Sequence, residues 1–265
     1  MTEATQAVGA IVQAAPSLSG LQRSRWWLAG LRQVIPWLRD SSLTCVWQTL
    51  RRLGLRYKRG RHYVHSPDPD YALKLAYVRA AENLARREPA RYVVVYQDEM
   101  TYYRRPTLAQ AYAPVGRKQP LAPSGQGANS KRRVCASLNF LTGHVVAHQR
   151  SSFDRRALLA HYRALEAAYP HVQTIFVVQD NWPVHFHPDI LLALVGSRIT
   201  LLRLPTYAPW TNPIEQVWRR LRQELLHLHP LVDDWPALQQ AVDCWFDQWQ
   251  QPSPDLLHYV GLTPY

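Results

Sequence analysis

The chain has 265 residues, of which 47% are apolar, and it carries a formal net charge of +12. This apolar content is ample for a buried core, and the excess of Lys and Arg favours a polyanionic partner over a merely basic soluble protein. No apolar run approaches the length of a membrane span, so no membrane association is expected. The cysteines Cys45, Cys135 and Cys244 lie too far apart for a zinc ribbon or a disulfide framework, and they suit a reducing cytoplasm.

The N-terminal segment offers little to anchor it. Residues 1–20 are rich in Ala, Ser, Thr and Gln and are expected to form a flexible tail, with a poor helix as the alternative. They lack a basic start and contain Glu3, so no secretion signal is expected. In residues 21–35, apolar side chains recur at helical spacing and predict a helix that Pro36 ends.

A second helix is predicted over residues 43–53. Ser41 or Ser42 can cap its start, and Gly54 follows its end. Two helices in this order are typical of a helix-turn-helix, in which the second helix is the recognition helix. Its inward face is expected to hold five apolar residues, Leu43, Val46, Trp47, Leu50 and Leu53.

Basic and polar residues crowd the exposed side of this helix and the segment after it. This crowding predicts a small DNA-binding domain over residues 21–66, whereas the alternative is a helical bundle with a solvated basic face. Gln48 and Arg51 are best placed to reach base edges, and the others are expected to meet phosphate. The predicted DNA contacts are Thr44, Gln48, Arg51, Arg52, Arg56, Lys58, Arg59 and Arg61.

A proline-rich joint follows, and it predicts a domain boundary near Pro67. Residues 71–87 have helical periodicity, so residues 67–90 are expected to form a linker and a bracing helix. Residues 91–265 are then expected to form one larger domain.

Two β-branched runs are each followed by an acid. Residues 92–96 predict a central strand that leads to Asp98 and Glu99, and residues 175–178 predict a second strand that leads to Asp180. Acids at strand ends commonly line ligand crevices in α/β folds. Neighbours along a strand point to opposite faces, so Asp98 rather than Glu99 is the predicted ligand.

A third acid, Glu215, starts a helix. Residues 201–204 predict a strand, prolines interrupt it, and an amphipathic helix follows that Thr211 or Asn212 can cap. The alternative for Glu215 is an ordinary first-turn acid that complements the helix dipole. Three carboxylates brought together would repel one another unless protons or a cation joined them, and Mg²⁺ suits such oxygen ligands.

The remaining pattern fills in a sheet. Tyr102 and Tyr103 suggest a strand paired as a hairpin with the first, and residues 134–140 and 144–148 predict two more strands. Residues 151–168 predict a helix before the parallel strand that leads to Asp180. Trp218 and Trp245 are expected in the core rather than against bases. Three basic residues are equally consistent with DNA contact and with flanking a strand: Lys131, Arg132 and Arg133.

The segments VVYQDEM, VVQDNWPVH and LPTYAPWTNPIEQVW carry a family resemblance. With them, residues 24–250 resemble the DDE transposases of the mariner-like superfamily, most closely the bacterial insertion-sequence 630 family. The third segment is the most specific, and the spacing between Asp180 and Glu215 also fits. Family members usually carry a longer DNA-binding region, so this chain looks shortened before residue 21.

The resemblance implies an α/β, RNase H-like catalytic core preceded by a small all-α helix-turn-helix or winged-helix domain. It implies that Asp98, Asp180 and Glu215 hold two Mg²⁺ ions, for which Mn²⁺ can substitute. The implied reaction is cut-and-paste transposition at TA: cleavage of transposon ends and strand transfer into target DNA. The implied partners are the terminal inverted repeats, target DNA and a second copy of the chain on DNA, in a bacterial cytoplasm.

Four further residues fall in the matched segments and are expected to support the site: Glu99, Asn181, His185 and Asn212. His185 is expected to orient the site or to touch a substrate phosphate, and a structural role is the alternative. Two other functions stay open. The chain could be a truncated, catalytically silent DNA-binding remnant, or an RNase H-like nuclease without strand transfer, and the reaction products distinguish these.

Overall fold

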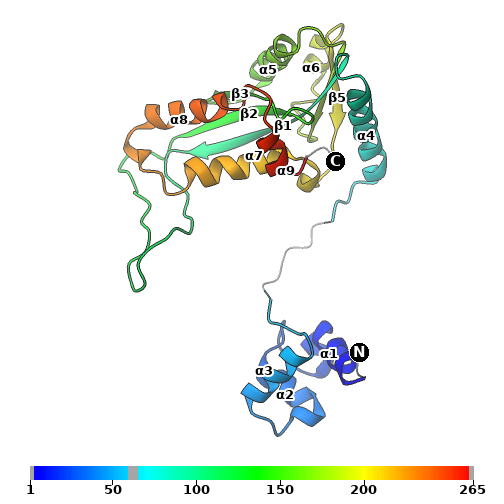
Figure 1. The fold of residues 1–265 in the computed structure, drawn as a ribbon, viewed down its shortest axis with the longest axis vertical. Helices are drawn as coiled ribbons and strands as arrows, with labels where there is room; N and C mark the ends of the chain where they lie inside the picture. Colours follow the sequence, from blue (N-terminus) through cyan, green and yellow to red (C-terminus); the bar gives the residue numbers. More distant parts are fainter. Residues whose placement is uncertain (1–2, 59–64, 263–265) are drawn as a thin grey trace. The chain divides into compact units, whose positions relative to one another are not determined.

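The structure is a computed structural model that describes residues 3–58 and 65–262 (Figure 1). The chain divides into two compact units, Met1–Tyr63 and Val64–Tyr265. None of the helices within the described ranges is both long and apolar enough to cross a membrane.

The N-terminal unit is helical. It contains α1 (Glu3–Gln13), η1 (Pro16–Ser19), α2 (Leu28–Val34), η2 (Pro36–Leu38) and α3 (Leu43–Arg52). The prediction of a flexible tail over residues 1–20 is wrong and the helical alternative holds, because α1 places Val8 in the core of this unit with only 1% of its surface exposed. The helix predicted over residues 21–35 is confined to α2. The core of the unit consists of Val8, Leu31, Ile35, Leu38 and Val46.

Helix α3 begins where the sequence predicts. The hydroxyl of Ser42 accepts a hydrogen bond from the Cys45 N–H at 3.2 Å and so caps the helix. Val46 is fully buried, but Leu43 and Trp47, which were predicted to face inward, are 43% and 46% exposed. A short helix that packs mainly on α2 buries only a narrow stripe, and that stripe is centred on Val46.

The larger unit is built on a five-stranded mixed sheet. Its strands are β1 (Tyr92–Tyr103), β2 (Lys131–Asn139), β3 (Val145–Arg150), β4 (Thr174–Gln179) and β5 (Ile199–Arg203). Their order is β3-β2-β1-β4-β5; β1, β2 and β3 are antiparallel neighbours, whereas β4 runs parallel to both β1 and β5. This confirms the predicted RNase H-like arrangement.

Strand β1 is longer than predicted. Tyr102 and Tyr103 do not form a second strand in a hairpin, because the ladder with β2 continues without interruption from Val95 to Tyr103. The partner strand β2 enters only after the loop of residues 104–130, and its first residue, Lys131, pairs with Tyr103. Asp98 therefore lies within a strand rather than at its end.

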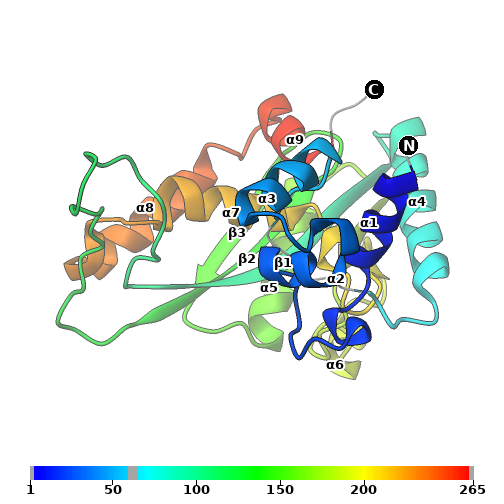
Figure 2. The ribbon, with the colours of Figure 1, turned by 90° about the horizontal axis from the view of Figure 1, so that it is seen from below.

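Helices cover both faces of this sheet (Figures 1 and 2). One face packs against α5 (Arg155–Ala168) and α6 (Pro188–Ala193). The opposite face packs against α4 (Tyr71–Arg87), α7 (Ile214–Leu221), α8 (Trp235–Asp247) and α9 (Pro254–Val260). Three short helical segments complete the unit: η3 (Pro209–Thr211), the π-helical η4 (Arg222–Leu226) that continues α7, and η5 (Leu231–Asp233).

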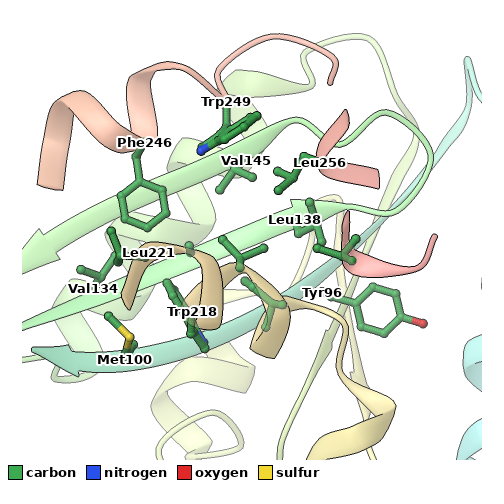
Figure 3. Close-up of a cluster of buried hydrophobic side chains, with 14 of the residues drawn as sticks. Tyr96, Met100, Val134, Leu138, Val145, Trp218, Leu221, Phe246, Trp249 and Leu256 are labelled. Atoms are coloured by element: carbon green, nitrogen blue, oxygen red, sulfur yellow. The ribbon is translucent and has the colours of Figure 1, made fainter. Parts of the chain in front are cut away.

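Alternation along β1 divides its side chains between the two faces. The even-numbered residues from Val94 to Tyr102 face α7 and α8. Trp218 is 1% and Trp245 8% exposed, as predicted for core residues. Figure 3 shows Trp218 in this cluster together with Tyr96 and Met100. On the α5 face, Val93 and Val95 pack with Leu158, Tyr162, Leu165, Ile175 and Val177.

Helix α4 has the predicted bounds. Leu73 and Leu84 are 52% and 39% exposed. The buried stripe consists of Val78, Ala81 and Ala85, at helical spacing. These small residues let the helix backbone approach the sheet closely, so the larger side chains are left at the margin.

Beneath the α5 face lies a buried polar cluster. The Oγ of Ser137 is 2.8 Å from Nε2 of His161, and the Nδ1 atoms of His148 and His161 are 3.0 Å apart. One of these two imidazoles donates and the other accepts. Burial lowers the pKa of His161 to about 3, and the neighbouring His148 and His185 add to this effect.

Acidification from pH 7 to pH 5 is therefore expected to lower the free energy of unfolding by about 2 kcal/mol through His161. Unfolded histidine takes up a proton near pH 6.5, whereas folded His161 resists protonation until about pH 3. The stability that neutral His161 contributes is thus present above pH 6.5 and is lost as the pH falls toward 3. Urea unfolding at both pH values should show a smaller pH effect for His161→Gln, and equal pH effects would contradict this assignment.

Candidate active site

Strand register brings Asp98 and Asp180 onto the same face of the sheet. The parallel ladder pairs Tyr96 of β1 with Val178 of β4, and both side chains pack on the α7 side. Asp98 and Asp180 each follow two residues later, so alternation directs both toward α7. The prediction that each acid ends a strand holds for Asp180, which follows the last residue of β4, but is wrong for Asp98, which pairs with Ala136 inside the sheet.

Glu215 reaches the same region from the first turn of α7. The N-cap position of this helix is Pro213, so neither Thr211 nor Asn212 occupies it as predicted. Asn212 does contact the helix start, because its Oδ1 accepts a hydrogen bond from the Ile214 N–H at 3.4 Å. Its Nδ2 donates to the backbone carbonyl of Gln97 at 3.2 Å. Since Gln97 precedes Asp98, this hydrogen bond ties the start of α7 to the strand that carries Asp98.

One pocket of about 360 Å³ contains all three carboxylates. Asp98, Asp180 and Glu215 line it together with Asn181, Trp182, Asn212 and residues 204–209. Within residues 3–58 and 65–262, no three Asp, Glu, His or Cys side chains are grouped closely enough to hold a single metal ion. The three acids therefore share the pocket as separate groups.

The donors in this pocket are oxygens of the kind that suit a hard divalent cation. Besides the carboxylates, Asn181 has its amide nitrogen fixed, since Nδ2 donates to the Leu204 carbonyl at 2.7 Å. Its Oδ1 is buried and has no hydrogen-bond partner among the described residues. An unpaired buried oxygen beside several carboxylates fits Mg²⁺ or Mn²⁺ better than a zinc site of Cys and His.

The pocket shifts the pKa values of its acids. Burial raises the pKa of Asp98 to about 7; a hydrogen bond from Trp218 acts against this, and the charges of Glu215 and Glu99 reinforce it. Burial also raises the pKa of Glu215. For Asp180, the upward effect of burial is outweighed by His185 and by the N–H of Trp182, so its pKa is lowered.

Glu99 points to the opposite face from Asp98, as strand alternation predicts. It accepts a hydrogen bond from Nε2 of Gln97 at 3.3 Å, and the thiol of Cys135 lies 3.5 Å away. Glu99 is not among the residues that line the pocket. Its carboxylate instead contacts His185, with Oε2 3.5 Å from Nε2 of the imidazole.

His185 lies between Glu99 and Asp180. Its Nε2 is 3.2 Å from Oδ1 of Asp180, and only 1% of the side chain is exposed. Burial lowers the pKa of His185, but the two carboxylates more than offset this and raise it to about 9. Because the imidazole is buried against Asp180, this geometry favours the predicted orienting role over contact with a substrate phosphate, and both roles stay predictions.

Trp218 is the site residue that the sequence analysis assigned only to the core. Its Nε1 donates a hydrogen bond to Oδ2 of Asp98 at 2.8 Å. One signal could have revealed this contact: Trp218 lies three residues after Glu215, so the two side chains occupy the same side of α7.

The predicted DNA-contacting residues of the N-terminal unit are exposed wherever the structure describes them. Arg59 and Arg61 lie outside the described residues. Strand β2 begins with Lys131, Arg132 and Arg133, so these residues are part of a strand rather than flanking one. The Arg133 guanidinium lies 5.9 Å from the ring centre of Trp182, a pocket residue. The exposed residues of the N-terminal unit are Thr44, Gln48, Arg51, Arg52, Arg56 and Lys58.

Comparison with known proteins identifies a family and a relative that match this chain. A family profile described as DDE superfamily endonuclease matches residues 93–239, which is more than half of the chain. An uncharacterized 39 kDa protein of insertion element IS630 from Shigella sonnei is 24% identical over 235 residues, covering 87% of this chain and 67% of that protein.

Solved structures share the fold. The Mos1 transposase paired-end complex with the left transposon end has a TM-score of 0.67 at 17% identity, covering 97% of this chain and 74% of that chain. The Mos1 mariner paired-end complex with Mn has the same TM-score at 16% identity and the same coverage, and the complex with Mg has a TM-score of 0.63 at 17% identity. The similarity to the insertion-element protein and the fold shared with Mos1 agree with the resemblance to the insertion-sequence 630 and mariner-like transposases. The profile match establishes that this chain belongs to the DDE superfamily endonucleases.

Proposed function

We propose that the chain is a transposase that cuts DNA at transposon ends and transfers the freed ends into target DNA at TA. The observation that carries this proposal is the pocket in which Asp98 and Asp180, from neighbouring parallel strands, meet Glu215 from the start of α7. Membership of the DDE superfamily endonucleases supports it.

Asp98, Asp180 and Glu215 are the proposed ligands of two Mg²⁺ or Mn²⁺ ions, with the free Oδ1 of Asn181 beside them. Such ions, when bound, lower the pKa of an attacking water and neutralise charge that builds on the phosphate. The surrounding residues hold the ligands in place: Trp218 fixes Asp98, and His185 fixes Asp180.

The proposed chemistry has two steps, cleavage and joining, and the joining step keeps the number of phosphoester bonds constant. In cleavage, the oxygen of water bonds to phosphorus, and the 3′ oxygen leaves and takes up a proton. In joining, that 3′ hydroxyl attacks a target phosphate, loses its proton, and displaces another 3′ oxygen. One ester bond replaces another, so one pocket can serve both steps without a further energy source.

The N-terminal unit is proposed to bind the terminal inverted repeats through its exposed basic surface. Arg52, Arg56 and Lys58 are expected to contact phosphates, and Gln48 and Arg51 base edges. Two transposon ends must be held together during transfer, so a homodimer is proposed on DNA.

The products of one reaction test this function. Duplexes that carry the inverted repeats flanking the gene should be incubated with a supercoiled target plasmid and Mg²⁺ or Mn²⁺. The expected result is ends joined to the plasmid, with no product when the cation is chelated. Hydrolysed strands without joining would indicate a nuclease, and DNA binding without any cut would indicate a silent remnant.

A further inference from the structure

Tyr207 combines three features at the mouth of the pocket. It lines the same pocket as the three carboxylates, its side chain is 74% exposed, and its backbone φ is 54°. A non-glycine residue rarely adopts this left-handed conformation, and an aromatic residue pays a steric cost there. Such strain persists only where the surrounding structure fixes the backbone.

The backbone on the N-terminal side of Tyr207 is fixed by a buried anchor. The N–H of Thr206 donates to Oδ2 of Asp68 at 2.7 Å, and the carbonyl of Thr206 accepts from the hydroxyl of Ser66 at 2.6 Å. The Asp68 side chain is only 2% exposed, and Nζ of Lys74 lies 2.6 Å from its Oδ2. Ser66 and Asp68, which precede α4, therefore anchor the loop of residues 204–212 at Thr206.

The loop is fixed from two other directions as well. Nδ2 of Asn181, a pocket residue, donates to the carbonyl of Leu204 at 2.7 Å and to the hydroxyl of Thr206 at 3.2 Å. After Tyr207, the hydroxyl of Thr211 donates to the carbonyl of Ala208 at 2.7 Å. These bonds leave the backbone at Tyr207 little freedom, while the ring itself remains exposed. The fold thus holds a strained residue whose exposed side chain lines the same pocket as Asp98 and Asp180.

We propose that Tyr207 stacks against a nucleobase next to the scissile phosphate. This inference rests on the proposed action of the pocket on DNA. Every base has a π-face, so an exposed aromatic ring can hold a base that has left the helical stack without reading its sequence. Trp182 lines the same pocket and lies beneath the guanidinium of Arg133, which adds a second ring and a positive charge for the DNA strand.

Three substitutions separate the ring from the backbone. Tyr207→Phe retains a stacking ring, whereas Tyr207→Ala and Tyr207→Gly both remove it. Glycine adopts positive φ without steric cost, so Tyr207→Gly should be at least as stable as wild type, and Tyr207→Ala should melt at a lower temperature than Tyr207→Gly. Loss of function in the glycine variant therefore cannot be attributed to unfolding.

Tyr207→Phe is expected to cleave transposon-end DNA at nearly the wild-type rate. The alanine and glycine variants should each lose about ten- to a hundred-fold in kcat/KM, the range expected for one lost base–aromatic contact. Wild-type kcat/KM in Tyr207→Gly would overturn the proposal.

A binding measurement tests the stack without any cleavage. Transposon-end DNA should carry 2-aminopurine at the nucleotide next to the scissile phosphate, and its fluorescence should be recorded with the full chain in EDTA. Wild type and Tyr207→Phe are expected to change the fluorescence in the same way, and Tyr207→Gly is expected to lose that change at saturating protein. An unchanged response in Tyr207→Gly would overturn the stacking contact even if the DNA were never cut. A wild-type chain that stacks the base but forms no cut or joined product would contradict the proposed function alone.

Discussion

Replacing Asp180 with alanine or asparagine is expected to lower DNA cleavage by roughly a thousand-fold or more, while binding to transposon-end DNA changes little. Asp180 lies in the shared pocket, and its side chain is 58% exposed and held by His185 from behind. Asparagine keeps the size of the side chain and the oxygen that accepts the Trp182 N–H, which lies 2.9 Å from Oδ1, but it removes the negative charge. Gel assays of cleavage, with gel-shift assays of binding, measure the two effects separately.

A surface acid provides the matched control for this variant. Asp189 of α6 is 63% exposed, forms an ion pair with Arg155, and does not line the pocket. Asp189→Asn should therefore cleave DNA at the wild-type rate, because an exposed ion pair contributes little to stability. Substantial cleavage by Asp180→Ala would contradict the assignment of this carboxylate to the chemistry.

Replacing Trp218 with phenylalanine is expected to lower cleavage by roughly ten- to a hundred-fold and to raise the Mg²⁺ concentration needed for half-maximal rate. Phenylalanine keeps most of the apolar contact with the core, including the neighbouring Phe246, whose ring centre is 6.2 Å away. It lacks the Nε1–H that donates to Oδ2 of Asp98 at 2.8 Å. Asp98 would then lose the partner that fixes its carboxylate, so the effect should fall on cation use and rate.

Trp245 offers a second buried tryptophan for comparison. It is 8% exposed, and its Nε1 donates to Oε2 of Glu224 at 2.8 Å. Glu224 does not line the pocket. Trp218→Phe and Trp245→Phe should each cost roughly 1–2 kcal/mol of stability in urea unfolding. Only Trp218→Phe should impair cleavage. Equal cleavage rates in the two variants would show that the Trp218 hydrogen bond does not support the site.

The sheet and the acids of the pocket were accessible from the sequence because local patterns encode them. β-branched runs marked β1 and β4, and alternation separated Asp98 from Glu99, so the faces of both side chains followed from period two alone. The proline-rich segment before Glu215 marked the break between β5 and α7. These signals lie within a few residues of each acid.

The sequence-based predictions fail where residues distant in the sequence decide the local structure. Nothing near Val8 shows that Leu31 and Ile35 will bury it, so a polar-rich segment was assigned to a tail. The length of β1 depends on how far β2 pairs with it, across the loop of residues 104–130, which carries no register information. The positive φ of Tyr207 gives no local signal either, and the N–H of the preceding Thr206 is held by Asp68 from another part of the sequence.

The measurement that tests the central claim most directly is the number of Mn²⁺ ions bound by the full chain in the presence of transposon-end DNA. Electron paramagnetic resonance measures this number. Wild type is expected to bind two ions, and Asp98→Asn, Asp180→Asn and Glu215→Gln are each expected to lose at least one, with Asp189→Asn binding like wild type. Wild-type binding by any one of the three pocket variants would contradict a shared cation site built from Asp98, Asp180 and Glu215.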